Sequence, residues 1–552
     1  MKIIRKLLGV VTAAVLSVGI LTSMPKSSGV AEAADVSGLS AKQICAQMGA
    51  GWNLGNTLES TGANGLISET SWSNPRATQQ LIKAVKAKGF TTIRIPVTWG
   101  NHLLNNSNTI DPEWFARVHE VVDWAMEEGF FVILNIHHED TWLIPDKNKY
   151  NSVSTKFKAI WKQIANEFRD YDRHLIFEGM NEPRTVGSAA EWGGGTASER
   201  AVINDLNQDF VSTVSATGGN NSTRALMIPT YAASNENAAM SALKIPNDSN
   251  IIVSIHAYTP YYFTMNGYTT FDQSMSSQLS GVIKSIYNTF VKNGIPVCIG
   301  EFGASDYKNT SERVKWVEAF ADLAIKYSMP VVIWDNNSYS NSQRPNDNFG
   351  LISRDSLKWY YRSDDVVKAL IKKFGGTEVS YTPVYGDGSK TAKIGSGWTV
   401  RTTLTKTELL SGHSESEIES ITVKCNYRMN INGSTHPYEY TVDGSSIPSS
   451  LSVEVLGDPD RTATVWWEIT FKQTGTLLGD IDDNGVVDVT DLTCFARYLA
   501  HWPGYDETTL NLANAEIDGE DGVTAADYSI FARYLAGWNG YAEKYGFVPR
   551  PR

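Results

Sequence analysis

The stretch Leu175-Ile-Phe-Glu-Gly-Met-Asn-Glu-Pro183 joins a short β-rich run to a polar turn. Residues 175–178 have the length of a buried strand, and polar residues begin where that run ends. Similar runs occupy 51–54, 91–97, 130–136, 224–229, 251–256, 296–301 and 330–334. Helical patterns separate the runs, so the sequence predicts eight strands that alternate with helices.

The spacing of these strands predicts a parallel sheet closed into a (β/α)8 TIM barrel over residues 36–375. Helix starts are predicted at Asn74-Pro75 and Asp111-Pro112, where a capping side chain precedes a proline at the first helical position. A doubly wound open sheet is the competing fold. It is disfavoured because no Gly-rich phosphate loop follows the first strand.

Length and charge narrow the possible roles of the chain. At 552 residues the chain is longer than a single hydrophobic core normally supports, so more than one domain is expected. Its net charge is −12, and no Lys/Arg-rich block follows the first few residues, which argues against nucleic acid as a partner. The four cysteines lack CxxC spacing, so neither a zinc site nor a dense disulfide framework is predicted.

The first residues have the pattern of a secretory signal. Basic residues at Lys2, Arg5 and Lys6 precede an apolar run at 7–21, and Ala31-Glu-Ala33 offers a cleavage site. We therefore expect a signal peptide over 1–33 and a secreted, extracellular protein with no membrane span after cleavage. An uncleaved membrane anchor is the alternative, but the run is shorter than the roughly 20 residues that cross a bilayer.

Two glutamates stand at the ends of predicted strands. Glu182 follows the fourth strand, and Glu301 ends the seventh. The chemistry of such barrels lies at the carboxyl ends of the strands, and a facing pair of carboxylates is what cleavage of a glycosidic bond requires. The alternative is an ordinary turn at Asn-Glu-Pro and a strand-end ion pair at Glu301.

Polar or aromatic residues at other strand ends favour the catalytic reading. They are Arg94, His137, His256, Tyr258 and Trp334. The motif His137-His-Glu139 lacks the spacing of a zinc-binding HExxH helix, so a metallohydrolase is not predicted. Of the two histidines in this motif, His137 is the one assigned to the site.

Three motifs carry a family resemblance over roughly residues 40–370: Gly51-Trp-Asn-Leu-Gly-Asn-Thr57, His137-His-Glu139 and Asn181-Glu-Pro-Arg184. The region resembles the endoglucanase and xyloglucanase branch of glycoside hydrolase family 5. The resemblance implies a retaining endo-β-1,4-glucanase that acts on cellulose and related β-glucans without a catalytic cofactor. Xyloglucanase or β-mannanase activity and transglycosylation stay open, as does a non-catalytic glycan-binding scaffold component.

The resemblance also implies roles for individual residues. Glu182 is expected to be the acid/base and Glu301 the nucleophile. Asn181 is expected to contact the sugar 2-hydroxyl, His137 and His256 to shape the −1 subsite, and Trp334 to form its platform. Arg94 and Tyr258 are expected to orient Glu301 and lower its pKa, while the pKa of the acid is expected to be raised.

Residues 378–475 change to a period-2 alternation, which predicts a β-sandwich module. In the run from Thr464 to Phe471 the apolar face includes Trp467, and the polar face includes Trp466. Trp467 is therefore expected in the core and Trp466 on a wet face, where an indole can stack on sugar rings. This predicts a substrate-binding role for Trp466 in a carbohydrate-binding module. The alternative is an immunoglobulin-like spacer whose exposed tryptophan packs on the catalytic domain.

The end of the chain contains a repeat. Phe495-Ala-Arg-Tyr-Leu-Ala500 recurs 36 residues later as Phe531-Ala-Arg-Tyr-Leu-Ala536, and an acidic loop precedes each copy. The calcium ligands expected from EF-hand spacing are Asp480, Asp482, Asn484, Val486, Asp488 and Asp491, and in the second loop Glu516, Asp518, Glu520, Gly522, Thr524 and Asp527. The second loop departs from the pattern, with Asp521 at the position of the usual glycine.

Two such loops, each followed by one helix, resemble a dockerin module, which we assign to residues 478–552. The resemblance implies an α-helical module that binds Ca²⁺ and attaches the enzyme to the cohesin domain of a scaffoldin in a cellulosome. It places Val489-Thr490 and Ala525-Ala526 at the recognition positions. Because these pairs differ, interchangeable binding in two orientations is not expected.

Overall fold

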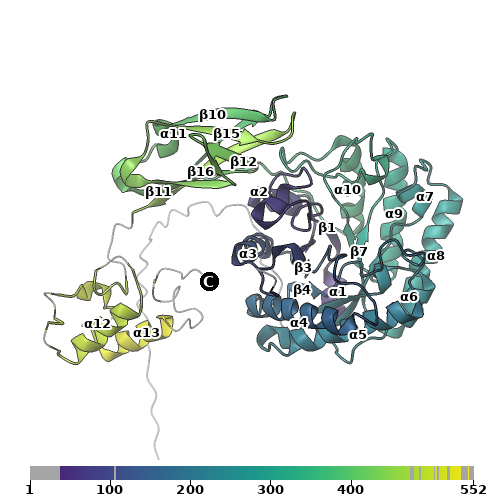
Figure 1. Ribbon diagram of the computed structural model, residues 1–552, viewed down its shortest axis with the longest axis horizontal. Coiled ribbons are helices and arrows are strands. Elements are labelled where there is room, and N and C mark those ends of the chain that lie inside the picture. The colour runs from purple at the N-terminus through teal and green to yellow at the C-terminus, as the bar shows by residue number, and fades with distance from the viewer. Residues whose placement is uncertain are drawn as a thin grey trace, which may run out of the picture.

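A computed structural model describes residues 36, 38–104, 107–472, 478–483, 486–502, 504–506, 509–518 and 522–535, with 545 and 547. The predicted signal peptide and the expected calcium ligands Asn484 and Glu520 lie outside the described residues. Figure 1 shows a barrel, a β-sandwich beside it and a pair of C-terminal helices.

The barrel contains the eight parallel strands that the sequence predicts, closed in the order β1 to β8. Their bounds are β1 Ala50–Asn53, β2 Thr92–Ile95, β3 Phe131–Asn135, β4 Leu175–Glu178, β5 Leu226–Pro229, β6 Ile251–His256, β7 Val297–Phe302 and β8 Val331–Ile333. The (β/α)8 fold is therefore confirmed.

Helices surround the barrel as α1 Ala41–Gln47, α2 Gln79–Ala87, α3 Pro112–Glu127, α4 Tyr150–Glu167, α5 Ala197–Ser215, α6 Asn237–Ala242, α7 Tyr261–Thr264, α8 Gln273–Thr289, α9 Thr310–Lys326 and α10 Tyr361–Lys373. Asp111 caps α3 ahead of its first-turn proline, as predicted. The start predicted at Asn74-Pro75 is wrong, because α2 is capped by Thr78. The Asn74 amide instead donates to the Asn56 carbonyl oxygen at 2.7 Å and so braces the loop after β1.

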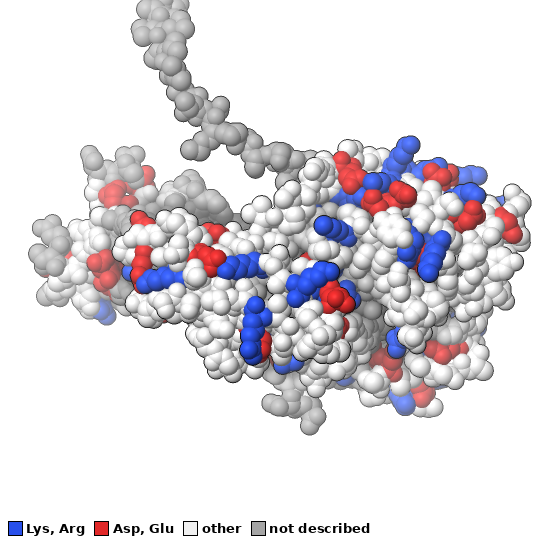
Figure 2. Space-filling view, turned by 90° about the horizontal axis from the view of Figure 1, so that it is seen from above, with Lys and Arg blue, Asp and Glu red and all other residues white. Residues whose placement is uncertain are grey.

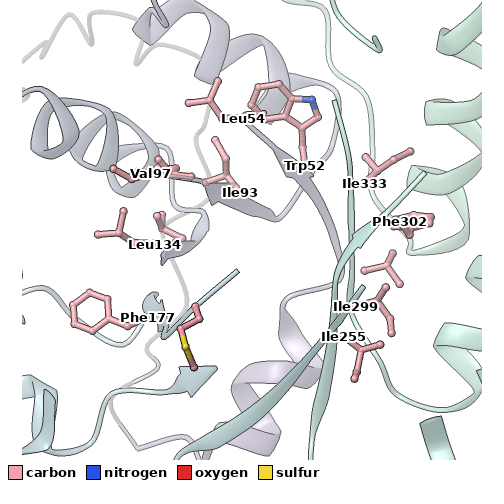
Figure 3. Close-up of a cluster of buried hydrophobic side chains, with 14 of the residues drawn as sticks. Trp52, Leu54, Ile93, Val97, Leu134, Phe177, Ile255, Ile299, Phe302 and Ile333 are labelled. Atoms are coloured by element: carbon pink, nitrogen blue, oxygen red, sulfur yellow. The ribbon is translucent and has the colours of Figure 1, made fainter. Parts of the chain in front are cut away.

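The two faces of each strand have different packing partners. Outward-facing apolar side chains pack against the helices and form the largest core; Figure 3 shows Ile93, Leu134 and Phe177 among them. On the inner face, Ile133 and Cys298 pack in a separate cluster with α1. Each buried aliphatic side chain of this kind contributes about 1.5–3 kcal/mol to folding.

The inner face becomes polar toward the carboxyl ends of the strands. Alternation along β2 and β4 puts Arg94 and Glu178 on the same face as the floor residues Thr92 and Ile176. All four are buried. The polar site thus lies directly above a fully buried floor, which excludes water from below.

The middle module is a sandwich of two four-stranded antiparallel sheets, in the orders β10-β15-β12-β13 and β14-β11-β16-β9. Its elements are β9 Gly388–Lys393, β10 Thr399–Thr405, α11 Lys406–Leu410, β11 Ile418–Cys425, β12 Arg428–Ile431, β13 Ser434–His436, β14 Glu439–Asp443, β15 Ser450–Leu456 and β16 Thr462–Phe471. Trp467 is buried in its core, as predicted.

Trp466 is placed differently from the expectation of a freely exposed ring. It is half-buried, its ring lies 5.5 Å from that of Tyr385, and its Nε1 donates to Glu468 at 3.2 Å. This face of the sandwich is turned toward α2 and α3 of the barrel. Strand alternation could place Trp466 outside the sandwich core but could not show that the barrel lies against that face.

Direct contacts join the sandwich to the barrel. The Arg76 amide donates to the Asn426 carbonyl oxygen at 2.9 Å, and the Thr462 amide donates to Asp355 at 2.8 Å. The Tyr438 ring lies under the Arg76 guanidinium, 4.9 Å from it, and its hydroxyl lies 3.0 Å from that of Thr70. The sandwich therefore packs on the loop that follows β1.

The C-terminal helices are α12 Val489–Leu499 and α13 Ala525–Leu535, one in each copy of the repeat. Phe495 and Phe531, which are equivalent in the repeat, share a small core. All four cysteines are free, in line with the absence of a predicted disulfide framework, and all four are buried. Among the described residues, no helix is long and apolar enough to cross a membrane.

Candidate active site

Glu182 and Glu301 face each other at the barrel mouth, with His256 between them. One oxygen of each carboxylate and one imidazole nitrogen lie within 4.8 Å of one another. The Nδ1 atom of His256 is 2.7 Å from Glu182 and 3.6 Å from Glu301. Glu301 is buried, whereas the side chain of Glu182 is 18% exposed. Glu182 is thus the carboxylate that is open to a bound ligand.

Arg94 holds the polar side chains of the mouth in place. Its guanidinium donates to Glu301 at 2.8 Å, to Glu178 at 2.7 Å and to the Asn181 side-chain oxygen at 2.8 Å. The Tyr258 hydroxyl donates to the second oxygen of Glu301 at 2.9 Å. Each oxygen of Glu301 therefore accepts a hydrogen bond from a fixed donor, which orients the carboxylate.

A β-bulge turns Glu301 toward the mouth. Along β6 and β7, Ile255 pairs with Ile299, but the next pair is His256 with Glu301, so Gly300 is an extra residue. Simple alternation from the inward-facing Cys298 would point Glu301 toward the helices. A side chain at Gly300 would come within 2.9 Å of the Ser254 hydroxyl, which explains the glycine there.

The remaining predicted residues of the barrel also gather at the mouth. His137 lies parallel to Trp334, with their ring centroids 6.1 Å apart, and its Nδ1 is 3.0 Å from the Asn135 amide. His138 packs on Trp72 at 5.5 Å. Trp466 belongs to the sandwich and is not among these mouth residues.

Glu139 of the same motif has a structural role. Its carboxylate accepts the backbone amides of Trp99 at 2.7 Å and Gly100 at 2.8 Å, and the Trp142 indole at 2.5 Å. It is buried and holds the loop after β2. Glu139 is therefore the member of the motif that braces a loop, and the neighbouring His137 and His138 rings lie 4.5 Å apart.

The pKa values differ from the expectation that the nucleophile is the more acidic carboxyl. Burial and the nearby Glu182 raise the pKa of Glu301, and His256, Arg94 and Tyr258 offset this only in part. Burial alone would also raise the pKa of Glu182, but the hydrogen bond and charge of His256, together with the nearby Arg184 and His138, outweigh it and lower that pKa. Glu301 and Glu182 in turn raise the pKa of His256 despite its burial. The expected order is wrong because His256 donates to Glu182 in the free site.

Sequence reasoning missed Glu178, a buried carboxylate at the end of β4. It accepts hydrogen bonds from Arg94, from the Asn135 amide at 3.0 Å and from the Ser254 hydroxyl at 2.6 Å. An acidic residue that closes an otherwise apolar strand was the available signal. Glu178 lies below Arg94 and neutralises its charge. The Arg94 guanidinium therefore donates hydrogen bonds to two carboxylates.

The two repeated loops each bring three carboxylates together. Oxygens of Asp480, Asp482 and Asp491 lie within 4.8 Å of one another, and so do those of Glu516, Asp518 and Asp527. Calcium holds its oxygens at 2.3–2.6 Å, so ligand oxygens lie at most about 5 Å apart, and both clusters fit the ion.

The last acidic residue of each loop is held in the same way. Asp491 accepts the amides of Ile481 at 2.7 Å and Asp488 at 2.8 Å, and Asp527 accepts the amides of Ile517 at 2.8 Å and Thr524 at 2.9 Å. Among the described residues, Asp527 of the second loop is therefore held in the same way as Asp491 of the first.

Two of the expected ligands cap helices. Asp488 accepts the Thr490 amide at 2.5 Å at the start of α12, and Thr524 accepts the Ala526 amide at 3.1 Å in the equivalent place. Val486 and Gly522 occupy the equivalent positions from which a backbone carbonyl is expected to reach the ion.

With this geometry in view, comparison with known proteins assigns the barrel. Residues 56–340 match the family described as cellulase (glycosyl hydrolase family 5). The chain belongs to glycosyl hydrolase family 5. Residues 478–536 match the dockerin type I domain, so this family 5 enzyme carries a dockerin, a calcium-binding type of domain.

Relatives cover the catalytic part of this glycoside hydrolase. Endoglucanase A of Ruminococcus albus is 44% identical over 350 residues, which are 62% of this chain and 95% of the relative. Endoglucanase A of Clostridium longisporum is 44% identical over 61% of this chain and 66% of its own length. The solved GH5-4 broad specificity endoglucanase from Ruminococcus flavefaciens matches with a TM-score of 0.60 and 47% identity, over 61% of this chain and 99% of that one.

Proposed function

We propose that the barrel hydrolyses internal β-1,4 linkages of cellulose and related β-glucans by double displacement, with Glu301 as nucleophile and Glu182 as acid/base. The observation that carries this proposal is the distance of at most 4.8 Å between an oxygen of Glu182 and one of Glu301. Retaining glycosidases hold their carboxyls about 5–5.5 Å apart, whereas inverting ones leave about 6.5–9.5 Å for a water molecule.

In the first step, an oxygen of Glu301 attacks the anomeric carbon while the glycosidic bond breaks. Glu182 gives its proton to the leaving oxygen. His256 and Glu182 share this proton across the 2.7 Å between the His256 Nδ1 atom and the Glu182 carboxylate. When the proton moves onto Glu182, that residue can act as the acid. In the second step, Glu182 takes a proton from the water that releases the sugar from Glu301.

The other mouth residues bind and orient the sugar in this proposal. Trp334, stacked beside His137, supplies the platform of the −1 subsite, and Asn181, held by Arg94, contacts the 2-hydroxyl. Arg94 also stabilises Glu301 when it is the leaving carboxylate of the second step. No part of this chemistry requires a metal.

The substrate range is proposed to centre on glucan backbones. The R. flavefaciens enzyme is described as a broad specificity endoglucanase, which supports glucans in general rather than cellulose alone. Product profiles on carboxymethylcellulose, xyloglucan, mixed-linkage glucan and mannan test this. Oligosaccharides from all the glucans are expected, and release from mannan alone would overturn the assignment.

The dockerin is proposed to anchor the secreted enzyme to a cohesin domain of a scaffoldin, outside the cell. Calcium would be held by the triads Asp480, Asp482 and Asp491, and Glu516, Asp518 and Asp527. The ion would neutralise each carboxylate cluster and so fix the loops against α12 and α13. The duplicated carboxylate triads support this role.

Glu182→Ala is expected to lower kcat/KM on β-glucan roughly 10²- to 10⁴-fold, because a sugar hydroxyl leaves poorly without a proton. On an aryl cellobioside, whose phenolate leaves unaided, the first step should be far less affected. Azide should restore turnover and give a β-glycosyl azide. Equal losses on both substrates, without an azide effect, would contradict an acid/base role.

The pH profile of kcat/KM is expected to be bell-shaped. The rate should rise with pH as Glu301 ionises. Because the pKa of Glu301 is raised, this acidic limb should lie at a higher pH than the pKa of an ordinary glutamate. The rate should fall as the His256–Glu182 pair loses its proton, and the raised pKa of His256 puts that limb above the ordinary 6.5.

His256→Ala is accordingly expected to move the basic limb to lower pH, because the limb then reports Glu182 alone. His413→Ala, on the exposed surface of the sandwich, is the matched control and should leave both limbs in place. An unchanged basic limb in His256→Ala would show that the pair does not share the catalytic proton.

A further inference from the structure

A groove of about 660 Å³ runs between the barrel and the sandwich. Its barrel wall comes from α2, α3 and the loop before α2, and its other wall from β11, β14, β16 and the segment after α10. The catalytic carboxylates are not among its lining residues. The groove is therefore separate from the barrel mouth.

Aromatic rings from both domains line this groove. Trp124 on α3 belongs to the barrel, and Trp466 on β16 belongs to the sandwich. Tyr385 lies beside Trp466, with the two ring planes 45° apart. Trp124 and Trp466 are half-buried, so part of each indole remains open to the groove.

The charges in the groove nearly balance. Its basic residues are Arg76, Lys83, Arg117 and Lys424, and its acidic residues are Glu120, Glu439 and Glu468. Most of these charges pair with one another: Lys424 binds Glu468 at 2.7 Å, and Arg117 binds Glu120 at 2.5 Å. A strongly charged ligand therefore finds no single-sign field in the groove. Figure 2 shows basic and acidic side chains interspersed over the face of the molecule seen from above.

We propose that this groove is a second binding site for a β-glucan chain, built jointly by the barrel and the sandwich. Aromatic faces flanked by amide and charged side chains suit a neutral ligand with an apolar ring face and many hydroxyls. Gln79 and Lys83 on α2 and the Lys424–Glu468 pair supply hydrogen-bonding groups around the rings. The identity of the ligand rests on the function proposed above, whereas the composite site rests on the geometry.

The composite site differs from a sandwich that binds glycan alone. Trp466 has one side against Tyr385 and faces α2 and α3 across the groove. Substitutions on either domain should therefore weaken the same binding event. This explains why a tryptophan outside the sandwich core lies on the face that meets the barrel.

Titration calorimetry of the full chain with a soluble cello-oligosaccharide tests the proposal. Glu301→Gln is the background, so that the ligand is not consumed. Two ligands per chain are expected, one at the mouth and one in the groove. Adding Trp466→Ala or Trp124→Ala should weaken the groove site roughly tenfold or more, as truncating a buried-interface tryptophan commonly does.

The mouth serves as the internal control, because its unchanged Kd shows that the barrel of each variant is folded. Trp398→Ala, which truncates an indole that is 59% exposed and outside the groove, should keep both sites. One ligand per chain in Glu301→Gln itself, or a loss in Trp466→Ala alone, would overturn the composite site. Failure of the proposed function would be distinct, since wild-type enzyme would then release no sugar from any glucan.

Discussion

Glu301→Ala is expected to lower kcat on β-glucan roughly 10⁴- to 10⁶-fold, the loss typical of removing a nucleophile that acts as part of a unit. The side chain is buried and accepts hydrogen bonds from Arg94 at 2.8 Å and Tyr258 at 2.9 Å, so no water or neighbour can replace it in that geometry. Azide should enter the vacated space and restore partial turnover. Its product should be an α-glycosyl azide, of inverted configuration, identified by NMR.

Glu236→Gln is a suitable control, because this exposed carboxylate after β5 lies at the start of α6 and makes no capping bond. It should leave kcat unchanged. A fully active Glu301→Ala variant, or a β-azide from it, would remove Glu301 from the nucleophile role. The contrast with the β-azide expected from Glu182→Ala makes the two carboxylates distinguishable in one assay.

Calcium removal is expected to abolish cohesin binding. Each loop holds three carboxylates within 4.8 Å, and without a cation their mutual repulsion opposes that arrangement. Because calcium binds the folded loops only, chelation removes its contribution to folding as well. Native gel shift or calorimetry with a cohesin should show a loss of at least about 10²-fold in affinity with EDTA.

Activity on soluble β-glucan gives the control for chelation, since the proposed mechanism uses side chains alone. EDTA should leave it unchanged. Asp491→Ala and Asp527→Ala separate the two loops, because each residue accepts backbone amides across its own loop. Cohesin binding that persists in EDTA would contradict a calcium-dependent module.

Much of the catalytic framework could be predicted from the sequence. Parallel strands buried on both faces are short apolar runs, and polar residues at their ends are conspicuous, as at Arg94 and Glu182. The prediction at Asn74-Pro75 failed because a proline after a capping residue also occurs in loops. Asn74 braces the turn at Asn56 there, and Thr78 caps the helix instead.

Long-range contacts were the part that could not be predicted. In the sequence, Glu178 looks like an ordinary residue at the end of a strand. Its role is visible only in the structure, where the Arg94 Nε atom lies 2.7 Å from its carboxylate. The pKa order of the two carboxyls depends on which of them His256 reaches, and that is a matter of side-chain placement across the mouth.

The sequence by itself determined the eight strands, the position of both glutamates at strand ends and the duplicated acidic loops, because these follow from local periodicity and spacing. Tertiary structure decided the rest. The bulge at Gly300 exists only where β7 pairs with β6, and it alone turns Glu301 inward. Likewise, the outer face that carries Trp466 borders a groove because the barrel packs beside it, a contact between residues far apart in the chain.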